Sequence, residues 1–190
     1  MKPHVRVLGF DDAPFLFREG KVIVIGVVMR LPGYVEGVIR TECAIDGDDA
    51  TEVLEGAVER SRFREQIKMI MIDGVALGGF NVVDIAKLHR STGLPVATVT
   101  RDAPDMEAIR RALQKHFADW ERRYSLIAGR ALHAVETGHL PLHVSVEGIS
   151  LEDADTIIKE SVVRGALPEV LRVAHVIASG VAKGESKGKA

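Results

Sequence analysis

The sequence is short of cysteine, aromatic residues and excess charge, and each shortage excludes a class of protein. Cys43 is the only cysteine, so an intramolecular disulfide is impossible and a reducing compartment is expected. Aromatic residues make up 5% of the chain, so the core must be built mainly from Val, Ile, Leu and Ala. A net charge of −2 excludes a protein that packages DNA by charge alone, but not a small enzyme that gathers its cations around one groove.

Long apolar runs are also absent. No uninterrupted stretch approaches the length that a membrane span requires. The N-terminus is too short and too interrupted by Lys2, His4 and Arg6 to be a signal peptide. We therefore predict a cytoplasmic protein with one domain over residues 1–182, followed by a disordered Gly/Lys-rich tail over residues 183–190.

The hydrophobic pattern predicts a strand, a hairpin, and then strands that alternate with helices. Strands have continuous β-branched runs, and helices repeat apolar residues every three or four positions. This order favours an α/β fold with a mixed β-sheet and helices on both faces. The expected strands are 5–10, 21–31, 34–45, 67–72, 96–100 and 143–146, and the expected helices are 50–61, 80–90, 106–120, 150–164 and 168–178.

Acidic residues stand where three of these elements begin or end. Asp11 follows the first strand, Glu52 lies in the first turn of the first helix, and Asp73 ends the next strand. The ends of parallel strands and the starts of the helices that follow share one edge of a sheet, so the three carboxylates are expected to converge. Such a cluster repels itself unless a hard cation such as Mg²⁺ or Mn²⁺ neutralises it, and its natural chemistry is hydrolysis of a phosphodiester.

Each acid also has a purely structural interpretation. Asp49 and Glu52 together form a helix-capping pattern. Asp73 with Gly74 is a common turn after a strand, and Asp11 would then simply begin a loop. Spacing alone leaves both interpretations open.

Five segments in chain order resemble endonuclease V. They comprise two strands that end in aspartate, a glutamate at the start of a helix, a strand that ends in a basic residue, and the two C-terminal helices. In this sequence the strands that end in aspartate are Val7–Asp11 and Ile70–Gly74, and Glu52, the glutamate, lies between them. The strand that ends in a basic residue is Leu94–Arg101, and the C-terminal helices fall in Ile149–His175. Arg101 takes the place of a lysine in that family, and the resemblance covers about residues 5–180.

A closer resemblance is to the mainly archaeal endonuclease dU family. The motifs that carry it are Gly-Phe-Asp-Asp at Gly9–Asp12, Asp-Gly-Asp-Asp-Ala-Thr-Glu at Asp46–Glu52, and Gly-Gly-Phe-Asn-Val-Val-Asp at Gly78–Asp84. The resemblance implies an RNase H-like, endonuclease V-like fold and an endonuclease that acts on deoxyuridine in DNA. It departs from endonuclease V at Glu42–Ile45, which lacks the Pro-Tyr-Ile-Pro wedge, in the Gly79 and Asn81 region, which lacks a His and an Arg, and near Glu147, where the C-terminal histidine position falls.

Several further residues are candidates for the site. Asp12 is a candidate metal ligand, although in an extended chain its side chain points away from that of Asp11. Asp46 either supports the site or fixes a turn. Gly79 is expected at a helix start, where backbone N–H groups bind phosphate or the glycines simply make a tight strand-to-helix turn with Phe80 in the core. Asn81 is a candidate for contact with a base edge. Arg101 is a candidate phosphate contact, with a surface salt bridge as the alternative.

The seven histidines show no metal-binding spacing, and His175 is expected to be a surface or core residue. We therefore predict a metal-dependent DNA endonuclease that needs single-stranded or locally opened DNA. Asp11, Glu52 and Asp73 are its predicted catalytic residues, and Asp11, Asp73 and Asp12 its predicted ligands for Mg²⁺ or Mn²⁺. Two alternatives are a binding module with a degenerate site on the same fold, and a phosphate-handling metabolic enzyme with a deep pocket beside Gly78 and Gly79.

Overall fold

The computed structural model describes residues 5–186 and has the α/β architecture that the sequence predicts. No helix in this range is long and apolar enough to cross a membrane. The main strands are β1 (Arg6–Asp12), β2 (Lys21–Arg30), β3 (Tyr34–Ala44), β4 (Ile67–Asp73), β7 (Val96–Thr100), β8 (His133–Val135) and β9 (Leu142–Glu147). The helices are α1 (Ala50–Glu59), α2 (Ile85–Thr92), α3 (Met106–His116), α4 (Trp120–Ala128), α5 (Leu151–Ser161) and α6 (Glu169–Lys183).

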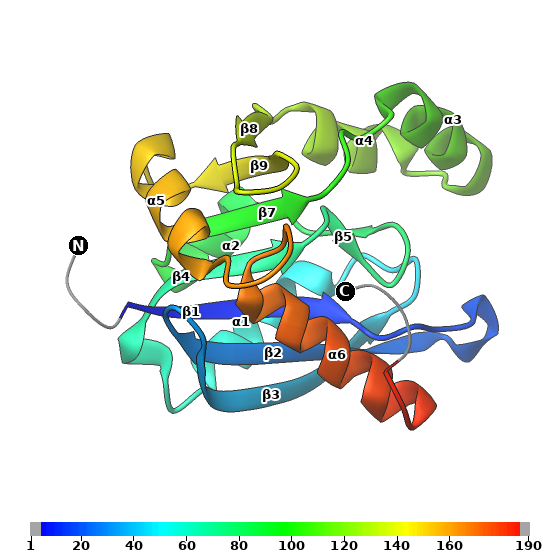
Figure 1. Cartoon of the computed structure of the whole chain (residues 1–190). Helices are drawn as coiled ribbons and strands as arrows, with labels where there is room; N and C mark the ends of the chain where they lie inside the picture. Colours follow the sequence, from blue (N-terminus) through cyan, green and yellow to red (C-terminus); the bar gives the residue numbers. More distant parts are fainter. Residues whose placement is uncertain (1–4, 187–190) are drawn as a thin grey trace.

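A seven-stranded mixed sheet forms the centre of the molecule, in the order β3-β2-β1-β4-β7-β9-β8 (Figure 1). Strands β1, β4 and β7 are parallel, whereas β2 and β9 pair antiparallel with β1 and β7. The three parallel strands therefore end at the same edge, which we call the carboxyl edge. The central strands are buried on both faces, as their unbroken Val, Ile and Met runs predict.

Helices cover both faces of the sheet. Figure 1 shows α5 and α6 in front of it and α1 and α2 behind it. Helix α6 crosses β1 closely: a Cβ atom added at Gly9 would lie 2.7 Å from Cγ2 of Val170, so only glycine permits this approach. The sheet and its covering helices enclose one large apolar core, and α3 and α4 belong to a smaller one beyond the sheet.

The structure corrects the expected pattern in three places. The helix expected over 80–90 begins only at Ile85, because two short strands, β5 (Ala76–Leu77) and β6 (Asn81–Val82), pair before it. The helix expected over 106–120 breaks at Phe117, and α4 and β8 were not expected at all. The tail expected over 183–190 falls partly on residues 187–190, which lie outside the described residues.

Candidate active site

Two aspartates from neighbouring parallel strands stand side by side at the carboxyl edge. Phe10 of β1 pairs with Ile72 of β4, and the same register continued by one residue places Asp11 beside Asp73. Both strands end here, so the two carboxylates are close enough to interact. Among the charged neighbours of Asp11, Asp73 has the largest effect on its pKa. The expected meeting of these two acids therefore follows from the register of β1 and β4.

Asp11 is buried, with 5% of its surface exposed. Its Oδ1 atom accepts a hydrogen bond from the backbone N–H of Asp12 at 2.9 Å. Burial, together with the negative charges of Asp73 and Asp12, raises the pKa of Asp11 to about 8. A carboxylate in this environment is ionised only at a cost unless positive charge is brought to it.

His175 of α6 supplies a contact that the sequence did not reveal. Its Nδ1 atom lies 2.8 Å from Oδ2 of Asp11. Gly9 and Asp11 share one face of β1, so the close crossing of α6 at Gly9 carries His175 over Asp11. The sequence predicted a surface or core residue rather than a ligand; His175 is partly buried, and its contact with Asp11 was not expected. Only the crossing of two distant segments brings it here, and no local motif marks it.

Asp12 points toward a different segment, as an extended chain requires. Its Oδ2 atom accepts a hydrogen bond at 3.0 Å from the backbone N–H of Gly78, in the loop between β5 and β6. Burial raises the pKa of Asp12, and the hydrogen bond from Gly78 opposes this effect. Asp12 therefore connects the acidic cluster to the loop of Gly78 and Gly79 between β5 and β6, which we call the glycine loop.

Asp73 and Arg101 lie together at the ends of β4 and β7. Asp73 pairs with Val99, and Arg101 follows two residues later as an exposed side chain. Burial raises the pKa of Asp73, whereas the nearby charges of Arg101 and His175 lower it. Within residues 5–186 no hydrogen bond or ion pair reaches the Asp73 carboxylate. Its oxygens are therefore free to bind a cation or a polar ligand.

Glu52 is not brought to this cluster. Its side chain is 52% exposed and forms an ion pair with Lys87 of α2. The buried face of α1 is made by Ala50, Leu54 and Ala57, which turns Glu52 outward. The capping interpretation also fails, because the Asp49 carboxylate accepts from the backbone N–H of Ala44 and makes no cap hydrogen bond.

Asn81 and Gly79 have other environments than expected. Asn81 is fully buried. Its amide nitrogen donates to Ala44 O and to Asp49 Oδ1, and its Oδ1 atom accepts from Ala50 N. Asn81 therefore fixes the junction of β3 and α1, which corrects its assignment to a base edge.

Gly79 is exposed, with a φ of +89°. It lies between β5 and β6 rather than at a helix start, so the expected helix N-terminus for phosphate is absent here. A Cβ atom at Gly79 would lie 2.3 Å from Oδ1 of Asp46, which explains the need for glycine. Asp46, itself at a φ of 54°, accepts a hydrogen bond from Phe80 N and so fixes this turn.

The donors at the carboxyl edge suit a hard cation in kind. Asp11 and Asp73 offer carboxylate oxygens, the ligands that Mg²⁺ and Mn²⁺ prefer. In residues 5–186 no three His, Cys, Asp or Glu side chains are grouped so as to hold a metal ion by themselves. Mg²⁺ is usually bound by one or two carboxylates with water and substrate oxygens, and these two aspartates match that arrangement.

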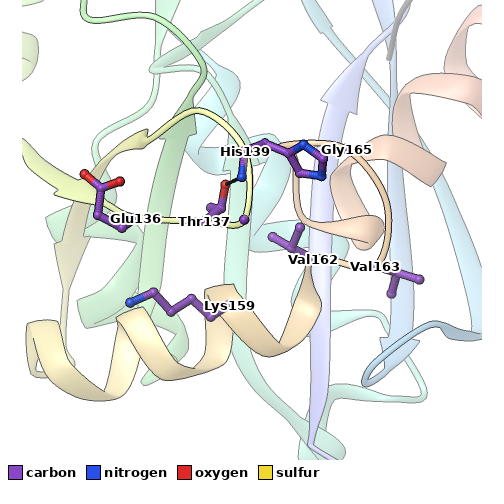
Figure 2. Close-up of a pocket in the computed structure, with 8 residues that line it drawn as sticks. Glu136, Thr137, His139, Lys159, Val162, Val163 and Gly165 are labelled. Carbon is purple, nitrogen blue, oxygen red and sulfur yellow. Dashed lines mark hydrogen bonds between the residues drawn. The ribbon is translucent and has the colours of Figure 1, made fainter.

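Two of the pockets in the described surface lie near the glycine loop and beside α5. A pocket of about 620 Å³ adjoins the glycine loop and is lined by Phe17, Asp46, Phe80, Ala112, His116 and Phe117. A smaller one, of about 280 Å³, lies between the β8–β9 loop and the end of α5. Figure 2 shows Lys159 and Glu136 on its two sides and His139 close to Gly165. Opposite charges thus line the smaller pocket, whereas rings line the larger one.

Comparison with known proteins places this geometry. The model of the endonuclease dU family matches residues 3–182. A UPF0215 protein of Methanothermobacter thermautotrophicus is 48% identical over 193 aligned residues, which cover 100% of this chain and 94% of that protein. A crystal structure of a protein of unknown function from Archaeoglobus fulgidus has a TM-score of 0.84 and 38% identity, and the match covers 93% of this chain and 98% of that one.

The sheet and helices also match endonuclease V. Ciona intestinalis endonuclease V, solved with a 24mer DNA containing an inosine, has a TM-score of 0.60 at 14% identity over 90% of this chain and 83% of that one. This likeness establishes the RNase H-like, endonuclease V-like fold. The family match spans almost the whole chain and includes the acidic cluster. The chain therefore belongs to the endonuclease dU family.

Proposed function

We propose that this protein is a DNA endonuclease that hydrolyses a phosphodiester bond near a deaminated base, and that this base is the uracil of deoxyuridine. The observation that carries the proposal is the pairing of buried Asp11 with Asp73 at the carboxyl edge, in a member of the endonuclease dU family. The substrate is single-stranded or locally opened DNA, because a base inside the stack does not expose its Watson–Crick edge.

Asp11 and Asp73 hold Mg²⁺ or Mn²⁺ in this proposal. Burial and mutual repulsion raise the pKa of Asp11 to about 8, so a cation at this edge offsets an electrostatic cost already present in the fold. When bound, a divalent ion stabilises the charge that develops on the phosphate and on the leaving oxygen. Asp12 lies next to these two residues but already accepts a hydrogen bond from Gly78 N, so it supports the site electrostatically.

His175 and Arg101 have separate tasks. His175 holds the Asp11 carboxylate in one orientation through its Nδ1 atom and is a positioning residue. Arg101 is exposed beside Asp73, where its planar guanidinium suits a backbone phosphate of the DNA. Glu52 has no part in the proposal, because its carboxylate pairs with Lys87.

Nicking of a labelled single-stranded oligonucleotide tests the proposal. The oligonucleotide carries one deoxyuridine, and matched strands carry deoxycytidine, deoxyinosine or thymidine at the same position. We expect cutting of the deoxyuridine strand with Mg²⁺ or Mn²⁺, no cutting in EDTA, and loss of cutting in Asp11→Asn and Asp73→Asn. Undiminished cutting in both variants overturns the assignment of the site. Binding of the oligonucleotide without any cutting overturns the nuclease and favours a nucleic-acid-binding module.

A further inference from the structure

The larger pocket, which adjoins the glycine loop, is lined mainly by aromatic rings. Phe17, Phe80 and Phe117 line it, and these are three of only six phenylalanines in the chain. Phe17 is 71% exposed at its rim and stacks edge-on against Phe15, with ring centroids 5.3 Å apart. A single exposed aromatic residue is ordinary, but this one lies at the mouth of a pocket lined by two further rings, where it can contact a ligand.

Internal contacts hold the walls of the pocket in place. The rings of Phe80 and Phe117 meet edge to face at 5.7 Å. Arg123 lies under Phe117, with Cζ 4.4 Å from the ring centroid, and its Nη1 atom donates to Gly47 O and Phe80 O at 2.6 Å. The Asp119 carboxylate accepts from Nε of Arg123 at 2.8 Å. The guanidinium is thereby committed to the frame, and the pocket is preformed.

A short chain of hydrogen bonds joins this pocket to the acidic cluster. Asp12 accepts from Gly78 N, and Gly78 O accepts from Asp46 N at 2.8 Å. Asp46 in turn accepts from Phe80 N at 2.8 Å through Oδ1. Asp12 follows Asp11 directly, so the pocket wall and the acid beside it belong to one connected loop system.

The lining fits a flat, neutral ring better than a phosphate. None of the described lining residues is Lys or Arg, the side chains that most often pair with a phosphate, and the carboxylate of Asp46 is unfavourable beside one. The deep pocket that the metabolic alternative requires beside Gly78 and Gly79 is thus present in place but has the wrong lining. Its volume falls within the roughly 300–1,000 Å³ of small-ligand sites. Aromatic rings stack on any nucleobase, because every base has a π-face.

Asp46 adds to this apolar lining a polar group that can distinguish one base from another. Its Oδ1 atom is engaged by Phe80 N, and among the described residues no hydrogen bond reaches Oδ2. An ionised carboxylate only accepts hydrogen bonds. Uracil and hypoxanthine carry a ring N–H on the Watson–Crick edge, whereas cytosine and adenine carry a lone pair there. A carboxylate that faces the ring nitrogen therefore favours the deaminated base over its parent, because the parent can offer only the exocyclic amino group beside that nitrogen.

We propose that the pocket lined by Phe17, Phe80, Phe117 and Asp46 receives an unstacked deaminated nucleobase of the DNA strand. Phe17 stacks on the base, and Asp46 accepts its ring N–H. This inference rests on the proposed function, since it names the subsite that would hold the base beside the bond to be cut.

A DNA-binding assay with a variant that is expected not to cut tests this inference. The full chain carrying Asp73→Asn is titrated against fluorescent single strands that hold one deoxyuridine or one deoxycytidine, with anisotropy as the readout. Phe17→Ala in this background is expected to weaken binding of the deoxyuridine strand by roughly five- to a hundredfold. Tyr34→Ala is the matched control, because Tyr34 is 62% exposed at the start of β3, at the opposite edge of the sheet. It is expected to bind as the parent does.

Asp46→Asn is expected to abolish the preference for deoxyuridine over deoxycytidine while leaving total binding in place. Phe17 is exposed, so its truncation opens no cavity, and thermal melting checks that each variant folds. Unchanged binding in Phe17→Ala, or a preserved preference in Asp46→Asn, overturns the inference. If the wild type cuts and the pocket variants behave as the parent, only this inference fails. If the pocket variants respond but the wild type does not cut, only the nuclease fails.

Discussion

The Nδ1 atom of His175 lies 2.8 Å from Oδ2 of Asp11, which links the last helix to the first strand at the acidic cluster. This contact predicts that His175→Ala slows nicking by about ten- to a hundredfold, as loss of a supporting contact does at metal sites. His175→Asn is expected to retain most of the rate, because its amide nitrogen stands where Nδ1 stood. The Mg²⁺ concentration for half-maximal rate is expected to rise in the alanine variant. If the His175→Ala variant has the nicking rate and the Mg²⁺ dependence of the wild type, or if His175→Asn is no faster than His175→Ala, the positioning role is contradicted.

Asp11→Asn is expected to stabilise the protein when divalent ions are absent. The folded-state pKa of Asp11 is about 8, above its ordinary value of 3.8. The stability that protonated Asp11 contributes is therefore complete below about pH 4 and is lost as the pH rises through 8. Asparagine stays neutral, so its advantage grows over this window to on the order of 5 kcal/mol.

Guanidinium unfolding in EDTA at pH 5 and pH 8 measures this difference. The gap between variant and wild type is expected to be larger at pH 8. Added Mg²⁺ is expected to stabilise the wild type more than the variant, since a ligand stabilises the state that binds it. A variant less stable than the wild type at pH 8 would show that Asp11 carries no electrostatic strain.

Asn81→Ala is expected to cost about 3 kcal/mol of unfolding free energy, because it removes three hydrogen bonds of a fully buried side chain and leaves their partners unsatisfied. Chemical denaturation followed by circular dichroism measures this loss. Normal stability together with impaired nicking would instead restore the base-edge role that the sequence suggested.

Glu52→Gln is expected to leave nicking within about twofold of wild type, because it breaks only an exposed ion pair with Lys87. Steady-state nicking at saturating Mg²⁺ gives the comparison, with Asp11→Asn as the inactive reference. A fall as deep as that of Asp11→Asn would return Glu52 to the catalytic set.

Arg101→Ala is expected to weaken binding of DNA regardless of its sequence and to lower the slope of log affinity against log salt by about one. Arg40→Ala is the matched control, because Arg40 lies on the edge strand β3 and pairs with Glu42. An unchanged salt slope in Arg101→Ala, or an equal change in the control, would remove Arg101 from the phosphate contacts.

Much of the fold was readable from the sequence, and the reasons are physical. The β-branched runs of β2 and β4 predict buried strands, and the Asp-Gly ending of β4 marks the carboxyl edge. The pairing of Asp11 with Asp73 followed from the parallel order of their strands. These features depend on local pattern and simple topology.

The parts that failed depend on tertiary contacts. The periodicity of residues 106–120 continues through Phe117, but the backbone of Phe117 is extended, and its ring packs against Phe80 and Arg123. Asn81 was expected in a helix and is held in a strand by bonds to the β3–α1 junction. His175 reaches Asp11 only because α6 crosses β1 at Gly9, an angle that no local pattern encodes.

The central claim is that Asp11 and Asp73 jointly hold a divalent ion at the carboxyl edge. Electron paramagnetic resonance of free Mn²⁺ during titration of the protein tests it most directly. The account predicts one binding site in the wild type, which is lost in both Asp11→Asn and Asp73→Asn and kept in Glu52→Gln. Mn²⁺ binding that survives in the two aspartate variants, or that disappears only in Glu52→Gln, would contradict it.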